Sequence, residues 1–361
     1  MQEIIQPILP TKKIAKPFKT YQVLIPVLLG LVVIGWLFLD EFNPDVFFSF
    51  DFTITSLLFI LLAFLLMLVR DFGMMLRFRL LTDNNLSWKQ AFHINVLSEF
   101  TTAVTPPAVG GSSLVVIFLI KEGINAGRST TIMFVNLFLD ELFFMLFCPL
   151  IFLFIPINEL FNSSSVIVST FGVIFSTLYV IRLFWISTLF IGTFKRPDWI
   201  RHILLTLFKL RILKRWYSNV DLLTNNLVQA SIDIANRSYW FWIKAFGMTM
   251  LTWTARFLVV NAIFMAFVPI SNHLVIFARQ LILWMVMVVS PTPGGSGISE
   301  YAFKEYYSDI FYSTSAIIFV TLVWRIISYY LYLILGLIVI PNWITKSFHK
   351  AGHENPPISE D

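Results

Sequence analysis

The sequence predicts an all-α polytopic membrane protein, arranged as an inverted repeat with two broken, re-entrant helix pairs. Hydrophobic residues make up 57% of the chain and charged residues 13%, whereas a soluble domain carries roughly 25% charged residues. Several apolar runs are long enough to cross a bilayer as helices. Two shorter runs are each interrupted by proline and paired glycine, and the interruptions lie 184 residues apart, at Gly110 and Gly294.

The interruptions read TPPAVGGS (105–112) and SPTPGGSG (290–297). Proline cannot continue a helix, and paired glycines destabilise one while allowing other groups to approach closely. Each string therefore predicts a break between two half-helices. Broken backbone at membrane depth is tolerated only where it is buried in protein or lines a wet cavity, and such a pair at matching places in two halves is typical of a transporter's binding site.

Taken in order, the chain divides into five predicted segments. They are a cytoplasmic tail (1–20), membrane repeat 1 (21–192), a basic cytoplasmic amphipathic connector (193–237), membrane repeat 2 (238–341) and a cytoplasmic tail (342–361). Repeat 1 is expected to hold spans at about 21–39, 53–69, 129–156 and 165–192 and the re-entrant pair at about 91–122. Repeat 2 is expected to hold spans at about 239–269 and 313–340 and the re-entrant pair at about 274–307.

Lysine and arginine predict the orientation. They gather in the first tail, in a short connector after the second span (Arg70, Arg77, Arg79 and Lys89), near Lys121 and Arg128, in 193–237 and in the last tail, while the other loops have almost none. By the positive-inside rule we expect a protein of the cell membrane with both termini on the cytoplasmic side. Segment 193–237 interleaves basic and apolar residues at helical spacing, which fits either a helix on the membrane surface or a solvated connector.

Composition also limits the kind of chemistry. Cys148 is the only cysteine, and the five histidines show no ligand spacing with it or with carboxylates, so we expect neither a metal nor a cofactor. No nucleophile–base pair and no phosphate loop is present, so we expect no catalytic residues and no enzyme. The net charge of +5 comes from basic residues beside apolar spans, which favours membrane lipids, preferably anionic phospholipids, over nucleic acid as partners.

Charges inside apolar spans are costly, which makes each one a candidate for function. They are Glu99, Asp140, Glu141, Arg182, Arg256, Arg279, Glu300, Lys304, Glu305 and Arg325. A half-helix that begins at a glycine pair presents free N–H groups to an anion such as phosphate, with serine hydroxyls and an arginine beside it. The predicted substrate-binding residues are Gly110, Gly111, Ser112, Gly294, Gly295, Ser296, Glu300, Arg325, Glu141 and Arg256.

A structural interpretation stands beside the functional one. The glycines can serve close packing, and the charges can pair with one another. Glu300 and Lys304 are four residues apart with the acid first, a favourable helical pairing. At the repeat offset Glu141 falls on Arg325, so these two charges can meet near a pseudo-twofold axis.

The strings above, together with Lys121-Glu122-Gly123, the segment PTPGGSGISE (291–300) and Arg325, resemble the flippase-like transmembrane domain of the lysylphosphatidylglycerol synthase family over roughly 20–341. In full-length members that domain is associated with moving aminoacylated phosphatidylglycerol between leaflets, and a separate cytoplasmic domain makes the lipid. The resemblance implies a stand-alone translocating domain here, without the synthase domain.

We therefore expect a lipid translocase that moves an anionic or aminoacylated phospholipid, or a polyprenyl-phosphate-linked lipid, between leaflets. A secondary transporter for a small polar solute is one alternative, with Glu300 or Glu141 as a proton site. The membrane subunit of a separately encoded lipid-modifying synthase or glycosyltransferase is another. The partners left open are a second copy of the chain and a separate synthase.

Overall fold

The computed structural model describes residues 53–107, 111–161, 166–209, 217–311 and 313–339. Within these ranges the chain forms helices and no strand, and five helices are long and apolar enough to cross a membrane. The prediction of an all-α polytopic membrane protein is confirmed. The first expected span (21–39) and both tails lie outside the described residues. The inverted repeat and the division into five segments stay predictions.

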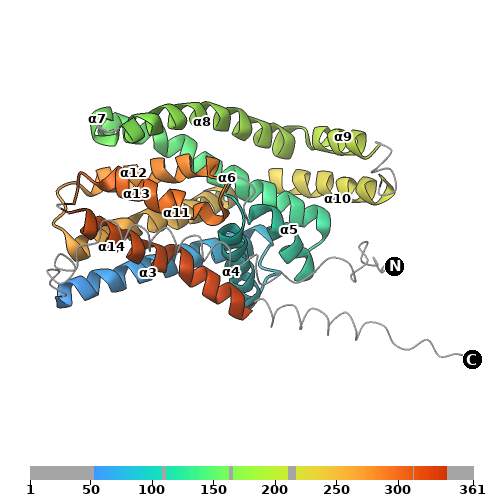
Figure 1. The fold of residues 1–361 in the computed structure, drawn as a ribbon. Coiled ribbons are helices and arrows are strands. Elements are labelled where there is room, and N and C mark those ends of the chain that lie inside the picture. Colours follow the sequence, from blue (N-terminus) through green and yellow to red (C-terminus); the bar gives the residue numbers. More distant parts are fainter. Residues whose placement is uncertain (1–52, 108–110, 162–165, 210–216, 312, 340–361) are drawn as a thin grey trace, which may run out of the picture.

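The long helices are α3 (Ile54–Leu81), α6 (Ala126–Phe154), α8 (Val166–Phe190), α11 (Tyr239–Phe267) and α14 (Thr314–Arg325). A π-helical turn continues α8 (Ile191–Lys195), and another continues α14 (Ile326–Tyr330) into further helix. α3 and α11 pack closely along each other (Figure 1). Gly73 permits this approach, because a Cβ there would lie 2.6 Å from the Thr252 hydroxyl.

The connector expected at 70–89 is wrong, because α3 continues without interruption to Leu81. Arg70 and Arg77 are fully buried inside this helix rather than exposed in a cytoplasmic turn. The helix continues through them because each is neutralised by a carboxylate at 2.6–2.7 Å, Asp71 for Arg70 and Asp140 for Arg77. These two arginines therefore carry no information about which side of the membrane is cytoplasmic.

The two broken helix pairs form as predicted, each with a break between two short helices. The first pair consists of α4 (Trp88–Val104) and α5 (Ser112–Lys121). The second consists of α12 (His273–Val286) and α13 (Ile298–Tyr307), with 3₁₀ turns at Met287–Val289 and Pro293–Gly295 between them. Ser87 and Gln90 form a capping box that fixes the start of α4, and the Asn272 side chain accepts from two N–H groups at the start of α12.

Ion pairs mark the two ends of the bundle. At one end, here named the Asp83 end, Asp83 pairs with Arg128 at the start of α6 and with Arg237 just before α11. At the other end, named the Asp309 end, Arg279 of α12 pairs with Asp309 and donates to the carbonyl of Glu159 in the short helix α7 (Ile157–Leu160). α4 begins near the Asp83 end and α12 near the Asp309 end, so the two broken pairs enter the bundle from opposite ends (Figure 1).

The basic connector forms two helices, α9 (Pro197–Phe208) and α10 (Tyr217–Ala235). α10 packs on the first part of α6, where Gly127 allows contact with the backbone of Asn226 and the Thr131 hydroxyl donates to the carbonyl of Leu227 at 3.3 Å. Trp199 and Ile203 of α9 remain exposed. The predicted helical character is present, and a position on the membrane surface stays a prediction.

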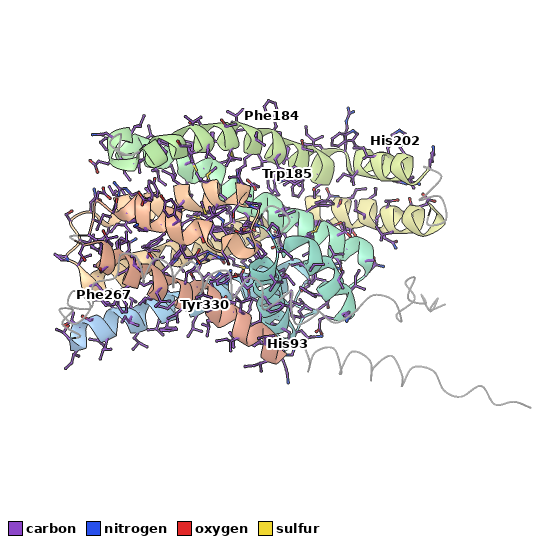
Figure 2. All side chains as sticks on the ribbon, viewed as in Figure 1. His93, Phe184, Trp185, His202, Phe267 and Tyr330 are labelled. Atoms are coloured by element: carbon purple, nitrogen blue, oxygen red, sulfur yellow. The ribbon has the colours of Figure 1, made fainter. Side chains whose placement is uncertain are left out.

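The outer faces of the long helices are apolar. On α3, Leu57, Leu61 and Leu68 are each more than half exposed, and on α8 Phe184 is 73% exposed (Figure 2). Such continuous exposed apolar surface is costly in water but favourable against lipid tails. The charges of the membrane helices instead pair with one another inside the bundle, as Arg77 does with Asp140 and Arg325 with Glu300.

Candidate functional site

The two breaks touch each other inside the bundle. The N–H group of Gly294 donates to the carbonyl of Thr105 at 2.9 Å, and the Tyr329 hydroxyl donates to the carbonyl of Ala103 at 3.2 Å. Gly294 has φ +58°, and a Cβ on it would lie 2.3 Å from the Tyr329 ring and 2.7 Å from the Ala103 carbonyl oxygen. Only glycine satisfies both the backbone conformation and the contact. The breaks therefore form a single junction between the two pairs.

A group of polar side chains surrounds the second break, and we name it the break cluster: Ser296, Ser299, Glu300, Arg325 and Tyr329. Glu300 is fully buried. Its carboxylate accepts from the N–H of Gly297 at 2.7 Å and from Arg325 Nε at 2.7 Å, and the Ser299 hydroxyl lies 3.0 Å from it. One of the N–H groups that we expected to face a substrate anion, that of Gly297, thus already faces the carboxylate of Glu300, which caps its own half-helix.

Arg325 is held by the same cluster. Its Nη2 contacts the Ser299 hydroxyl and lies 3.5 Å from the Gly294 carbonyl. The expected helical pairing of Glu300 with Lys304 is wrong, because Glu300 pairs with Arg325 and Lys304 lies 3.7 Å from Glu305. Removal of either partner would leave the other charge buried and unpaired, which is strongly destabilising.

Ser296 and Gly295 have different surroundings. The buried Ser296 hydroxyl lies 2.9 Å from that of Tyr329, and since Tyr329 donates to Ala103, Ser296 is the donor of this pair. Gly295 has φ +69°, but the nearest atom to a Cβ there, on Ser299, would be 3.7 Å away. Ser296 therefore connects the two breaks, while a Cβ on Gly295 would make only ordinary van der Waals contact.

At the first break, Gly111 serves close packing. A Cβ there would lie 2.1 Å from the Ser98 carbonyl oxygen, and its N–H donates to the Thr102 hydroxyl at 3.0 Å. The packing interpretation of the glycines thus applies to Gly111 and to Gly294. Gly110 and the Ser112 side chain lie outside the described part of the chain.

A second polar group lies on α3, α4, α11 and the helix that follows α14, and we name it the arginine cluster: Arg70, Asp71, Asn95, Glu99, Arg256 and Tyr332. Asp71 accepts from Arg70 at 2.7 Å, from the Asn95 amide at 3.0 Å and from the Tyr332 hydroxyl at 2.7 Å. Arg70 also contacts Glu99, and its guanidinium lies over the Tyr332 ring. The cluster contains two cations and two carboxylates and is formally neutral.

Arg256 is the most loosely held charge of this cluster. Its nearest polar partner among the described residues is Glu99 Oε2, at 3.6 Å from Nη1, which is longer than a hydrogen bond. The guanidinium lies 4.0 Å from the ring centroid of Trp284 in α12, a cation–π contact, and its side chain is 14% exposed. Arg256 of α11 thus contacts Glu99 of the first broken pair and Trp284 of the second.

The segment after α14 connects the two clusters. Tyr329 belongs to the break cluster, and Tyr332, three residues on, belongs to the arginine cluster. Between them the buried Tyr330 hydroxyl has no hydrogen-bond partner among the described residues. These residues follow or lie in the π-helical turn Ile326–Tyr330, and such turns occur frequently at functional sites.

Glu141 is not part of either cluster. It pairs with Arg182 of α8 through two contacts of 2.8 Å, so the expected meeting of Glu141 and Arg325 is wrong. Its neighbour Asp140 binds Arg77 through both oxygens, at 2.6 and 3.2 Å, and accepts from Trp253 Nε1 at 2.8 Å. Although positions 141 and 325 are equivalent by sequence offset, Glu141 pairs with Arg182 and Arg325 pairs with Glu300.

Sequence reasoning missed Arg70, Asp71, Arg77 and Tyr332. The charged residues directly follow an apolar run, a pattern that also marks the end of a span. The available signal was spacing: Arg70 and Arg77 are seven residues apart, with Gly73 between them, and so lie on one face of a continued helix.

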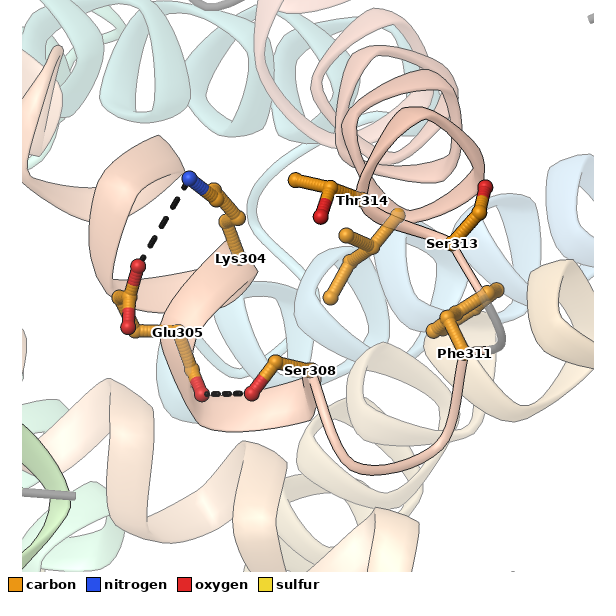
Figure 3. Close-up of a pocket in the computed structure, with 7 residues that line it drawn as sticks. Lys304, Glu305, Ser308, Phe311, Ser313 and Thr314 are labelled. Carbon is orange, nitrogen blue, oxygen red and sulfur yellow. Dashed lines mark hydrogen bonds and ion pairs between the residues drawn. The ribbon is translucent and has the colours of Figure 1, made fainter. Parts of the chain in front are cut away.

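A cavity lies at the Asp309 end, next to α13 and the start of α14. It measures about 310 Å³, and Lys304 and Glu305 of α13 line one wall while Ser313 and Thr314 line the other (Figure 3). A second cavity of about 210 Å³ lies between α6 and α8 and is lined by Cys148, Pro149, Phe152, Phe175 and Tyr179. No group of three or more histidines, cysteines or carboxylates suited to a metal ion is found among the described residues.

Comparison with known proteins gives two matches. The family model described as "Lysylphosphatidylglycerol synthase TM region" matches residues 23–336, a range that contains both broken pairs. A protein of Archaeoglobus fulgidus described as "UPF0104 membrane protein" is 24% identical over 295 residues, which cover 80% of this chain and 88% of that protein. No solved structure matches the chain.

Proposed function

Because the chain belongs to the family of the lysylphosphatidylglycerol synthase transmembrane region, we propose that it is a lipid translocase. The resemblance inferred from the motif residues is thereby confirmed at the level of the family. The proposed substrate is an anionic or aminoacylated phospholipid, or a polyprenyl-phosphate-linked lipid, which passes between leaflets while its tails stay in the bilayer. In this proposal the chain is a carrier and not an enzyme, in the cell membrane with both termini cytoplasmic.

The junction of the two breaks is the observation that carries the proposal. Gly294 and Thr105 bring two short helix pairs from opposite ends of the bundle into contact. A substrate held at such a junction reaches either end when one pair moves relative to the other, which is the basis of alternating access. The two charged clusters, which the helix segment from Tyr329 to Tyr332 connects, supply the groups that a polar headgroup needs inside a membrane.

The apolar outer helices favour a lipid as the substrate. α3 and α8 expose leucine and phenylalanine side chains along their length, so the tails of a lipid can follow the protein surface while the headgroup moves through its interior. The break cluster and the arginine cluster each contain arginine and carboxylate, and such pairs suit a headgroup with phosphate and amine.

The test is translocation in proteoliposomes. Purified protein is reconstituted with a trace of phosphatidylglycerol labelled with a fluorophore on one tail, and a membrane-impermeant reductant quenches the label in the outer leaflet. Translocation by the protein raises the quenched fraction above the roughly one-half expected from the outer leaflet alone. Liposomes without protein and liposomes with an unrelated membrane protein serve as controls. Equal quenching in all three contradicts the proposal.

One observation favours the second candidate, a transporter of a small polar solute. The cavity at the Asp309 end has a polar lining, and the almost buried Lys304 contributes to it. Its volume of about 310 Å³ is at the lower limit for a small-molecule site. Uptake of radiolabelled phosphate or amino acids into the same proteoliposomes, without lipid translocation, would favour this candidate.

A further inference from the structure

We propose that the arginine cluster takes up the anion of a headgroup together with one proton, with Arg256 receiving the anion and Glu99 receiving the proton. The inference rests on the proposed function and adds to it a coupling to the proton. It follows from three features of the cluster: its charge count, the loose hold on Arg256, and the unequal donors of the two carboxylates.

The charge count comes first. Arg70 and Arg256 balance Asp71 and Glu99, so the cluster is formally neutral without a substrate. A phosphodiester anion adds one negative charge in a place largely removed from water. An uncompensated charge there is costly, and a carboxylate in such a place becomes neutral by protonation.

The anion goes to Arg256 because the protein leaves its donors available. Glu99 lies 3.6 Å from Nη1, beyond hydrogen-bond distance, while the face of the guanidinium rests on Trp284. A guanidinium held by its face still presents its N–H groups in its plane, where two phosphate oxygens can accept them. Arg70, in contrast, is fully buried and engaged with both carboxylates.

The proton goes to Glu99 because Asp71 has more donors. Asp71 accepts from Arg70, the Asn95 amide and the Tyr332 hydroxyl, all within 3.0 Å, and these bonds favour its ionised form. Glu99 is held by Arg70 and by the loose contact to Arg256, and its side chain is 12% exposed. When Arg256 turns to the anion, Glu99 keeps only the arginine that it shares with Asp71.

The groups that act on Glu99 come from several elements of the described part of the chain. α3 contributes Arg70 and Asp71, α11 contributes Arg256, and the helix after α14 contributes Tyr332. α5 and the turn Pro293–Gly295 also pack on α4; α5 carries Lys121 at its far end, and the turn has no titratable side chain. No second acid among these groups lies closer to Arg256.

The exchange balances. The ion-pair contact between Arg256 and Glu99 is lost, two N–H···O bonds form between Arg256 and the phosphate oxygens, and a proton from water binds the Glu99 carboxylate. One anion and one proton enter, so the charge of the cluster is unchanged. Release of the proton on the other side restores the contact between Glu99 and Arg256 and expels the anion.

The experiment measures proton uptake on binding. Purified protein in detergent and a weak buffer near pH 7 receives dihexanoyl phosphatidylglycerol, and a pH indicator reports the protons bound while calorimetry reports the lipid bound. We expect about one proton per lipid for the wild type. Dihexanoylglycerol, which lacks the phosphate, is expected to cause no uptake.

Variants assign the two roles. Glu99→Gln is expected to bind the lipid without proton uptake, and Arg256→Gln is expected to lose binding by tenfold or more. Asp221→Asn is the control, because Asp221 of α10 pairs with Arg201 of α9 outside the cluster, and it is expected to take up protons as the wild type does. If Glu99→Gln does not fold, Glu99→Asp is used, and its uptake is expected to shift along the pH axis.

The inference is overturned if the wild type binds the lipid without proton uptake. It is also overturned if Glu99→Gln takes up a full proton, or if Glu99→Asp has the pH profile of the wild type. Failure of the proposed function is recognised separately, by the absence of lipid translocation in the proteoliposomes. A wild type that translocates the lipid but neither binds it at Arg256 nor takes up protons contradicts only the inference.

Discussion

Gly294 donates its N–H group to the carbonyl of Thr105, and this bond joins the turn of the second broken pair to the end of the first. The two residues belong to broken pairs that enter the bundle from opposite ends. Both bonding groups belong to the backbone, and the left-handed conformation of Gly294 directs its N–H toward Thr105. The predictions below concern this junction, the charges beside it and the orientation of the bundle.

Replacing Gly294 by alanine should destabilise the protein. The new Cβ would lie 2.3 Å from the Tyr329 ring, in a residue with φ +58°. Overpacking and backbone strain together are expected to cost about 2 kcal/mol or more. Thermal unfolding in detergent measures the change. Gly247→Ala is the matched control, since nothing lies within 4 Å of its Cβ and Gly247 lies in α11; a variant at Gly294 as stable as this control contradicts the prediction.

Replacing Gly295 by leucine should reduce lipid translocation more than folded yield. A Cβ on Gly295 would lie 3.7 Å from Ser299, which is ordinary van der Waals contact, so a larger side chain reaches into the break cluster without a severe clash at its first atom. Its φ of +69° adds strain, which Gly295→Ala measures alone. Translocation and yield are compared for both variants. An equal loss of activity and yield for leucine would mean that Gly295 serves only folding.

Replacing Tyr329 by phenylalanine should weaken the junction. The change removes the donor to the Ala103 carbonyl and the acceptor of the Ser296 hydroxyl, and leaves buried groups unpaired at a cost of about 1–3 kcal/mol. Tyr330→Phe is the control on the next residue. Its buried hydroxyl has no partner among the described residues, so its removal should be neutral or stabilising. Equal unfolding temperatures for the two variants would refute this difference.

Variants of the buried pair of Glu300 and Arg325 should distinguish an effect on folding from an effect on lipid translocation. Removing one partner leaves an unpaired buried charge and is expected to cost about 3–5 kcal/mol, while replacing both is nearly neutral. Glu300→Gln, Arg325→Gln and the double variant are compared by thermal unfolding and by translocation. We expect the double variant to fold and to fail to translocate the lipid, because in the proposed function these charges also bind the headgroup. A stable and fully active double variant would show that the pair is only structural.

Cysteine labelling tests the orientation. On a Cys148→Ser background, a cysteine at the exposed Ser271 should react with an impermeant reagent in intact cells, because it precedes α12 near the Asp309 end. A cysteine at the exposed Asn85, near the Asp83 end, should react only after the membrane is permeabilised. The opposite pattern would place the Asp309 end in the cytoplasm.

Much of the fold follows from single residues and their spacing. The described spans begin within three residues of the predicted positions, and both breaks fall at the proline and glycine strings, because neither residue type continues a helix. The charges that matter were visible as well, since Glu99, Arg256, Glu300 and Arg325 stand out in apolar runs. The exception is α3, where Arg70 and Asp71 resemble the end of a span although the helix continues after them to Leu81.

The partners of these charges could not be predicted, because they depend on which helices become neighbours. Glu300 pairs with an arginine 25 positions later in the chain and caps its own helix, while Lys304, at ideal helical spacing, contacts Glu305. Glu141 and Arg325 occupy equivalent positions by sequence offset, yet each pairs with an opposite charge on a neighbouring helix, Arg182 of α8 and Glu300 of α13. Sequence identifies the charges, and packing decides their pairs.

The π-helical turn at Ile326–Tyr330 adds one residue to a helical turn just after Arg325. Deleting one residue there would restore an ordinary helix and rotate everything beyond it by about 100° about the helix axis. Tyr332 would then leave the side of the helix that faces Asp71, while Arg325 would stay beside Glu300. The single inserted residue thus determines the angle about the helix axis between Arg325 and Tyr332, and with it the relative orientation of the two clusters.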